Sequence, residues 1–218
     1  MTPPLLRAED LVLAYDDHAV LRGASLELAV GARASLSGPS GSGKTTLLRV
    51  LAGLERPDAG RVLVGGEVAT DGRRLALPPW RRGIQLVFQD LGLWPTRTAL
   101  QNVADAVAAV GLDAPRRRAE EALSRLGIAD LAGRRPAHLS GGEARRLAMA
   151  RALATRPRIL LLDEPFASLD PEARRDGFAW LEEVLADTEA AVLLVTHDPW
   201  EVERLGGAAL RLEEGRIA

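Results

Sequence analysis

Several residue types are missing or scarce in this 218-residue chain. It has no cysteine, which excludes disulfides, thiolate metal sites and cysteine nucleophiles and makes a reducing compartment the default expectation. The start of the chain lacks the basic segment and apolar core of a secretory signal. Its longest apolar runs, residues 159–162 and 190–195, are far shorter than the ~20 residues that span a bilayer. Because 28 basic residues face 30 acidic ones, we also expect no nucleic-acid partner.

Lysine is also scarce, since Lys44 is the only lysine among 28 basic residues. It follows a glycine-rich loop that lies between a predicted strand at 32–37 and a predicted helix at 45–54, which is the context of a phosphate-binding loop. Glycines let backbone N–H groups turn toward phosphate oxygens, and the helix adds the positive end of its dipole. A glycine-rich turn with a chance lysine is the alternative, and the flanking strand and helix disfavour it. The residues predicted to bind the nucleotide are Gly38, Pro39, Ser40, Gly41, Ser42, Gly43, Lys44, Thr45 and Thr46.

Two acidic residues, Asp163 and Glu164, follow the unbroken apolar run 159–162. Such a run is typical of a parallel strand buried on both faces, and ligands bind at the carboxyl ends of these strands. We predict that Asp163 and the Thr45 hydroxyl hold Mg²⁺, while Glu164 acts as general base on the attacking water. A polar turn after a strand is the alternative, but the phosphate loop upstream favours hydrolysis.

The order of the patterns predicts an α/β protein with a core of mainly parallel sheet and an N-terminal antiparallel β subdomain. Residues 9–37 alternate like short strands, Gly65-Gly66 and Asp71-Gly72 mark turns, and Pro57 and Gly60 are expected to end the helix after Lys44. Residues 98–131 have helical spacing with a break at 111–115. We therefore expect one domain over residues 1–218, with a helical subdomain at roughly 90–155 inserted into the core.

A second helix start lies at Ser140, where Ser140 and Glu143 fit a capping box. Alone it could be a plain helix cap, but two glycines after the serine would let an anion approach the helix end closely. Residues 139–143 resemble the signature motif of the ATP-binding cassette (ABC) family, whose other motifs occur around it in order and cover nearly the whole chain. That family more often has glutamine where this chain has Glu143, and either residue can complete the capping box.

The resemblance implies a head-to-tail dimer with two ATP sites, in which the signature of one protomer meets the nucleotide held by the other. Ser140, Gly141 and Gly142 would then act in trans. It also implies roles for single residues that mean little alone: Tyr15 would stack on adenine, Gln89 would sense Mg²⁺ and water, Asp170 would lie in a loop at the dimer interface, and His197 would contact the γ-phosphate.

The resemblance also bears on the biological role. Residues 77–83, 91–103 and 134–136 are similar to importer subunits for small solutes and ions. Within this range, 98–100 and 102–103 are similar also to subunits for lipoprotein extraction or macrolide export. We expect an ATPase on the cytoplasmic face of the membrane, working with integral membrane permease subunits, a second ABC ATPase protomer, most simply an identical one, and, for import, a solute-binding protein. A non-transport ABC ATPase would be expected to show tandem cassettes, a coiled coil or zinc-binding cysteines, and a P-loop kinase has no use for residues 139–143.

Overall fold

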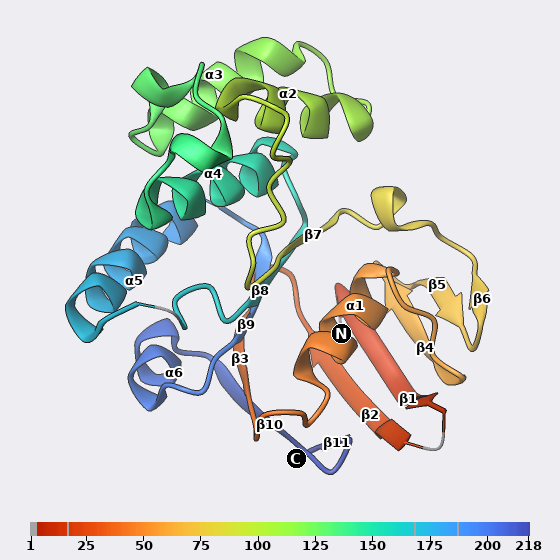
Figure 1. Ribbon diagram of the computed structural model, residues 1–218. Coiled ribbons are helices and arrows are strands. Elements are labelled where there is room, and N and C mark those ends of the chain that lie inside the picture. Colours follow the sequence, from red (N-terminus) through yellow and green to blue (C-terminus); the bar gives the residue numbers. More distant parts are fainter. Residues whose placement is uncertain (1–3, 17, 168, 187) are drawn as a thin grey trace. The chain divides into compact units, whose positions relative to one another are not determined.

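The computed structural model describes residues 4–16, 18–167, 169–186 and 188–218, which form two compact units (Figure 1). The first unit comprises the chain up to Leu86 together with Arg158–Glu164 and Glu189–Ala218. The second comprises Val87–Pro157 and Pro165–Thr188. It is mainly helical, and it extends beyond the residues 90–155 expected for a helical subdomain because it includes the long helix after Pro165.

The first unit is built on two sheets. The five-stranded sheet is antiparallel and has the order β2-β1-β4-β5-β6, with strands β1 (Leu6–Tyr15), β2 (His18–Leu28), β4 (Ala59–Val64), β5 (Glu67–Asp71) and β6 (Arg74–Leu75). The six-stranded sheet has the order β11-β10-β3-β9-β8-β7, with strands β3 (Arg33–Ser37), β7 (Ile84–Val87), β8 (Ile159–Asp163), β9 (Ala191–Val195), β10 (Ala208–Glu213) and β11 (Arg216–Ile217). The predicted fold class is therefore confirmed, including its antiparallel N-terminal part.

The parallel strands form the centre of the second sheet. Every residue of β8 and β9 is buried, as the unbroken apolar runs in the sequence predicted. β3 pairs in parallel with both β9 and β10, and β8 pairs in parallel with β9. Their apolar side chains join those of the antiparallel sheet in one hydrophobic core. This core fixes the strand ends on which the candidate site is built.

Helix α1 (Lys44–Ala52) follows the glycine-rich loop and places Leu47, Leu48 and Leu51 in the same core. The prediction that Pro57 and Gly60 end this helix was wrong. Gly53 ends it with a left-handed φ of 80°, and its amide donates to the carbonyls of Arg49 and Val50. A Cβ at Gly53 would lie 2.5 Å from Cζ of Arg82, so this position has no room for a side chain.

Arg82 is the largest fully buried side chain among the described residues and lies at the end of α1. Its guanidinium donates to the carbonyls of Leu51, Ala69 and Leu77 and to the hydroxyl of Thr70. Burial lowers the pKa of Arg82 to about 10. A cation beside the last carbonyls of a helix also complements the negative end of the helix dipole. Arg82 thereby attaches the C-terminus of α1 to the antiparallel sheet.

The second unit contains α2 (Ala99–Ala109), α3 (Pro115–Arg125), α4 (Gly141–Ala154) and α5 (Pro171–Ala186). α2, α3 and α4 pack against one another, as the green helices in Figure 1 show. Short 3₁₀ turns η2 (Ala129–Leu131) and η3 (Pro136–His138) connect α3 to α4, and the first unit adds η1 (Pro79–Arg81) and α6 (Pro199–Leu205). Arg116 and Arg117 pair with Glu120 and Glu121 on an exposed face. Among the described residues, no helix combines the length and apolar character needed to cross a bilayer.

Candidate active site

The candidate site lies where three parallel strands end. Leu36 of β3 pairs with Val195 of β9, and Val195 pairs with Asp163 of β8. The residues that follow these positions therefore meet at the same edge of the sheet. They are the start of the glycine-rich loop, Glu164, and Thr196 with His197. The register thus brings together predicted residues that are more than 100 positions apart in the chain.

The glycine-rich loop from Gly38 to Gly43 is closed around Lys44. The Lys44 ammonium donates to the carbonyls of Gly38 and Pro39, both at 2.9 Å, and only 7% of the residue is exposed. A Cβ at Gly38 would lie 2.2 Å from the carbonyl oxygen of Leu212, and one at Gly43 would lie 2.8 Å from Val20. Both glycines have positive φ, so no other residue fits either position without strain.

Two features of this loop suit it to an anion. The hydroxyl of Ser42 is buried and has no hydrogen-bond partner among the residues that the structure describes. The N-terminus of α1 likewise receives no side-chain cap from the described part of the chain. Helix ends normally satisfy their first N–H groups with a cap, with water or with a ligand. A phosphate group would supply both missing partners.

Thr45 and Asp163 form the candidate metal pair. The Thr45 hydroxyl donates to a carboxylate oxygen of Asp163 at 2.8 Å. Asp163 is only 4% exposed, and burial is the main cause that raises its pKa, while the bond from Thr45 opposes the shift. A hydroxyl beside a carboxylate is a set of oxygen donors that fits Mg²⁺. The described residues contain no group of three or more His, Cys, Asp or Glu that could hold a metal, so an ion held by this pair would need its further ligands from other groups.

Glu164 has a strained backbone, with a left-handed φ of 46° in a residue that is not glycine. Its amide donates to the carbonyl of Val195 at 3.0 Å, which fixes this conformation against the neighbouring strand. One carboxylate oxygen lies 3.7 Å from Nδ1 of His197, and the side chains are 22% and 59% exposed, respectively. Strained conformations concentrate at functional sites, where the surrounding structure imposes them. The carboxylate of Glu164 is therefore held at the strand edge beside an accessible imidazole.

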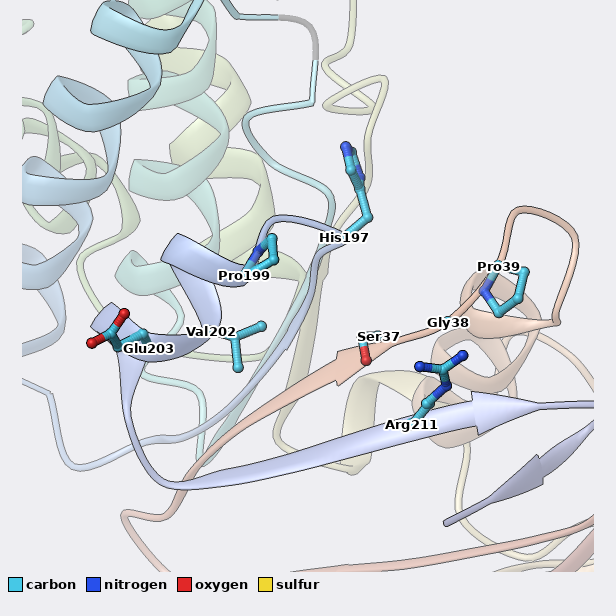
Figure 2. A pocket seen from close by; sticks show the side chains of 8 residues that line it. All are labelled: Ser37, Gly38, Pro39, His197, Pro199, Val202, Glu203 and Arg211. Atoms are coloured by element: carbon cyan, nitrogen blue, oxygen red, sulfur yellow. The ribbon is translucent and has the colours of Figure 1, made fainter.

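A cavity of about 500 Å³ adjoins this edge (Figure 2). Figure 2 shows His197, the first loop residues Gly38 and Pro39, and Arg211 of β10 around it, with α6 on the side opposite the loop. The remaining lining residues are Ser37, Pro199, Val202 and Glu203. His197 and the start of the phosphate loop thus border the same space.

The predicted residues Gln89, Ser140, Gly141, Gly142 and Asp170 belong to the second unit. The capping box at Ser140 is confirmed, because its hydroxyl accepts from the Glu143 amide and its own amide donates to the Glu143 carboxylate at 2.6 Å. That backbone bond is the main cause that lowers the pKa of Glu143. Asp170 accepts from the amides of Glu172 and Ala173 and so caps the start of α5. Residue 168, in the same predicted loop, lies outside the described residues.

The segment after Gln89 is held by two residues whose roles the sequence did not reveal. Arg151 of α4 donates to the carbonyls of Leu91 and Gly92, and its guanidinium lies 5.3 Å from the ring centre of Trp94. Asn102 is completely buried and exchanges hydrogen bonds with the backbone of Trp94. The helix that begins with the signature-like residues therefore also fixes the loop after Gln89.

Tyr15 was singled out in the sequence, whereas Glu201 was not. Tyr15 ends β1 and is 45% exposed, so its ring is accessible at the surface. Glu201 is buried and accepts a hydrogen bond from Thr196. Asp198-Pro-Trp-Glu201 has the spacing of a capping box, and this signal could have drawn attention to Glu201. Its carboxylate instead accepts from the hydroxyl of Thr196, which precedes the helix.

The parallel core, the glycine-rich loop with its lysine and the acidic strand end define a P-loop nucleotide-binding protein. Residues 21–167 match the family described as ABC transporter. The chain belongs to this family, as the resemblance in its sequence indicated.

Curated relatives of the chain are named import ATP-binding proteins. It is 40% identical over 219 residues to the sulfate/thiosulfate import ATP-binding protein CysA 2 of Agrobacterium fabrum, covering 97% of this chain and 62% of the relative. It is 44% identical over 186 residues to the thiamine import ATP-binding protein ThiQ of Chelativorans sp., covering 84% and 74%. The chain thus spans about three-fifths of the length of CysA 2 and other relatives.

A solved structure with a TM-score of 0.85 and 30% identity covers 97% of this chain and 96% of its own. It is the dimeric, post-hydrolysis state of the ATP-binding cassette MJ0796 bound to ADP and Pi. This similarity agrees with the fold described above.

Proposed function

We propose that this chain binds and hydrolyses ATP and that this hydrolysis drives transport through separate membrane subunits. The observation that carries the proposal is the edge of the parallel sheet, where Lys44, the Thr45–Asp163 pair and the strained Glu164 come together with His197. Each of these residues has a chemical role in hydrolysing a nucleoside triphosphate, and all belong to one compact unit.

In this proposal the loop from Gly38 to Thr46 binds the phosphates through its amides, and Lys44 adds a positive charge. Thr45 and Asp163 hold Mg²⁺, with Gln89 as a further ligand, and the ion when bound neutralises charge on the phosphate oxygens. Glu164 accepts a proton from the attacking water as general base. His197 stabilises the γ-phosphate, and the ring of Tyr15 stacks on the adenine.

We further propose that the active form is a dimer. Ser140, Gly141 and Gly142 of one protomer would meet the nucleotide of the other, and Asp170 would lie at the interface between them. The dimeric cassette with ADP and Pi, to which this chain is similar, supports this arrangement. Two identical protomers form the simplest dimer, because one chain carries both kinds of motif.

The transport role is supported by the relatives, whose names describe import of sulfate or thiosulfate, iron and thiamine. We propose that the chain acts at the cytoplasmic face of the membrane with permease subunits and, as an importer, with a solute-binding protein. Residues 98–103 favour the second candidate, an exporter or lipoprotein-extraction subunit, because they are similar to such proteins.

The chemistry is tested by Glu164→Gln in the purified chain. Removing the general base should lower kcat on the order of 10²-fold or more while ATP binding persists. The variant should also accumulate an ATP-bound dimer that is visible by size-exclusion chromatography. Glu67→Gln, at an exposed glutamate of β5, is the matched control and should behave as the wild type. Normal hydrolysis by Glu164→Gln would remove Glu164 from the mechanism.

The transport role is tested by capturing the tagged chain from gently solubilised native membranes. A multi-span permease among the copurifying proteins, identified by mass spectrometry, would support transport, and a solute-binding protein with it would support import. Ribosomal or DNA-repair proteins instead would leave the ATPase chemistry and overturn the transporter assignment.

A further inference from the structure

The buried carboxylate of Glu201 follows His197 in the chain, at the start of α6, and the proposed function gives it no role. Glu201 of α6 and Thr196, which directly follows β9, are each only 3% exposed. The Thr196 hydroxyl donates to a Glu201 carboxylate oxygen at 2.5 Å. This distance lies in the range of hydrogen bonds between a hydroxyl and a carboxylate, which are among the stronger ones in proteins.

The same hydroxyl also accepts a hydrogen bond from the amide of Asp198 at 3.1 Å. The amide of Thr196 donates to the carbonyl of Leu36, which attaches this residue to β3. Asp198 in turn caps α6 by accepting from the amide of Trp200. The backbone is therefore fixed on both sides of His197. Before it, the Thr196 amide bonds Leu36, and after it, the Asp198 amide bonds the Thr196 hydroxyl.

The side chain of His197 contrasts with these neighbours, because it is 59% exposed, and its Nδ1 lies 3.7 Å from a carboxylate oxygen of Glu164. An exposed imidazole has little packing to fix its direction, so its position depends on the backbone that carries it. In enzymes, a displacement of about 1 Å can cost on the order of 10²-fold in rate. A fixed backbone at this point would therefore matter for any reaction in which His197 takes part.

We propose that Glu201 is a positioning residue for His197. It holds the Thr196 hydroxyl, the hydroxyl holds the Asp198 amide, and the turn between them directs the imidazole along the edge of the sheet. This inference rests on the proposed function, in which His197 stabilises the γ-phosphate. It assigns Glu201 no contact with the nucleotide, only an effect on the residue that makes one.

The first test compares pairs of variants at each end of the bond. Glu201→Leu removes the acceptor and Thr196→Val removes the donor, whereas Glu201→Gln and Thr196→Ser keep an acceptor and a hydroxyl. We expect kcat to fall about ten-fold in the first two, with KM for ATP nearly unchanged, and to recover most of the loss in the second two. Circular dichroism and thermal melts select the variants that fold, and the two ends of the bond give independent routes to the same result.

A double-mutant cycle separates positioning from a general effect on the fold. If Glu201 acts through His197, Glu201→Leu should cost little further activity in a His197→Ala background. Equal fold-losses in the presence and absence of His197 would show that Glu201 acts elsewhere, and would overturn the proposal.

Imidazole NMR tests the proposal without hydrolysis. The chain has only three histidines, so the His197 signals can be assigned from the His197→Ala spectrum. Glu201→Leu and Thr196→Val should shift or broaden the His197 signals and leave those of His18 and His138 unchanged. Unchanged His197 signals would overturn the positioning role even if activity fell. A wild type that hydrolyses no ATP would overturn the proposed function, and the NMR result would still decide whether Glu201 positions His197.

Discussion

The chain carries two helix starts with the composition of an anion site, α1 after the loop at Lys44 and α4 after Ser140, and they are finished in different ways. At α1 the cap position is Gly43, no described side chain caps the helix, and its first turn has no acidic residue. At α4 the hydroxyl of Ser140 and the carboxylate of Glu143 close a complete capping box. One helix start lacks partners that the other obtains from its own sequence.

The N-termini of α1 and α4 can therefore bind an anion in different ways. The N-terminus of α1 has a positive dipole end, the cation of Lys44 and a buried Ser42 hydroxyl without a partner in the described chain, so a phosphate would complete it. The N-terminus of α4 is already capped by its own residues, and the carboxylate of Glu143 repels a second negative charge there. We therefore expect α1 to hold the nucleotide alone and α4 to contribute only in an assembled dimer.

The largest effects on ATP binding and hydrolysis should come from substitutions at the two helix N-termini, one at α1 and one at α4. Lys44→Ala should weaken ATP binding by the isolated monomer about ten-fold or more, because charge-assisted bonds to phosphate are lost. Ser140→Arg should leave that binding nearly intact and remove hydrolysis, because Ser140 serves the site of the other protomer. Titration with a fluorescent ATP analogue under monomeric conditions, followed by an ATPase assay, measures both quantities.

Either result can fail separately. Loss of binding by the Ser140→Arg monomer would contradict the trans arrangement, and full hydrolysis by this variant would exclude the signature from the reaction. Retained affinity in Lys44→Ala would mean that the backbone of the loop is sufficient for binding.

A smaller effect, on thermal stability, is expected from Asp163→Asn, which tests whether the edge beside α1 is built for a ligand rather than for stability. Burial raises the pKa of Asp163 and outweighs the nearby charges of Arg49 and Lys44, so its charged form costs folding free energy while no metal ion is bound. A neutral amide can still accept from the Thr45 hydroxyl. The variant should therefore melt a few degrees higher than the wild type at neutral pH, while Mg²⁺-dependent hydrolysis is lost. A lower melting temperature would show that the charge stabilises the protein.

Much of this architecture could be predicted because its signals are local. The apolar runs before Asp163 and Thr196 identify buried parallel strands, and the Ser140 to Glu143 spacing identifies a capped helix, since each pattern depends on neighbouring residues alone. The predicted end of α1 was wrong because the interpretation placed the helix end at Pro57 and Gly60 and treated Gly53 as helical. Gly53 is required there by Arg82, a residue that comes from a distant part of the sequence.

Long-range side-chain contacts explain the other omissions. Nothing near Arg151 in sequence indicates that it binds the carbonyls of Leu91 and Gly92, which lie about 60 positions earlier. Glu201 is instructive in another way, because its spacing from Asp198 predicts a bond to a backbone amide, whereas the strand end offers it the Thr196 hydroxyl instead. Local patterns thus located the elements, and tertiary contacts decided what the polar side chains on them bind.

The smallest expected effect concerns the carboxylate that distinguishes α4 from α1. The backbone amide of Ser140 is the main cause that lowers the pKa of Glu143. A lowered pKa in the folded state means that the stabilisation is present above the ordinary pKa of the unfolded chain and is lost as the pH falls through the lowered value. Glu143→Gln keeps the capping box but removes its charge. The variant should therefore melt slightly below the wild type at neutral pH and at the same temperature as the wild type at acidic pH.

Thermal melts of both proteins from neutral to acidic pH measure this difference, with Ser140→Ala as the matched control. That control removes the hydroxyl half of the cap, which should cost about 1 kcal/mol of stability, and it keeps most of the acid dependence because the Ser140 amide remains. Removing the charge should also tighten the assembled dimer on ATP, because α4 would no longer oppose the phosphate of the other protomer. If Glu143→Gln instead kept the full acid dependence of the wild type, the bond from the Ser140 amide to the carboxylate would not stabilise α4, and the contrast between the two helix starts would rest on the glycine at α1 alone.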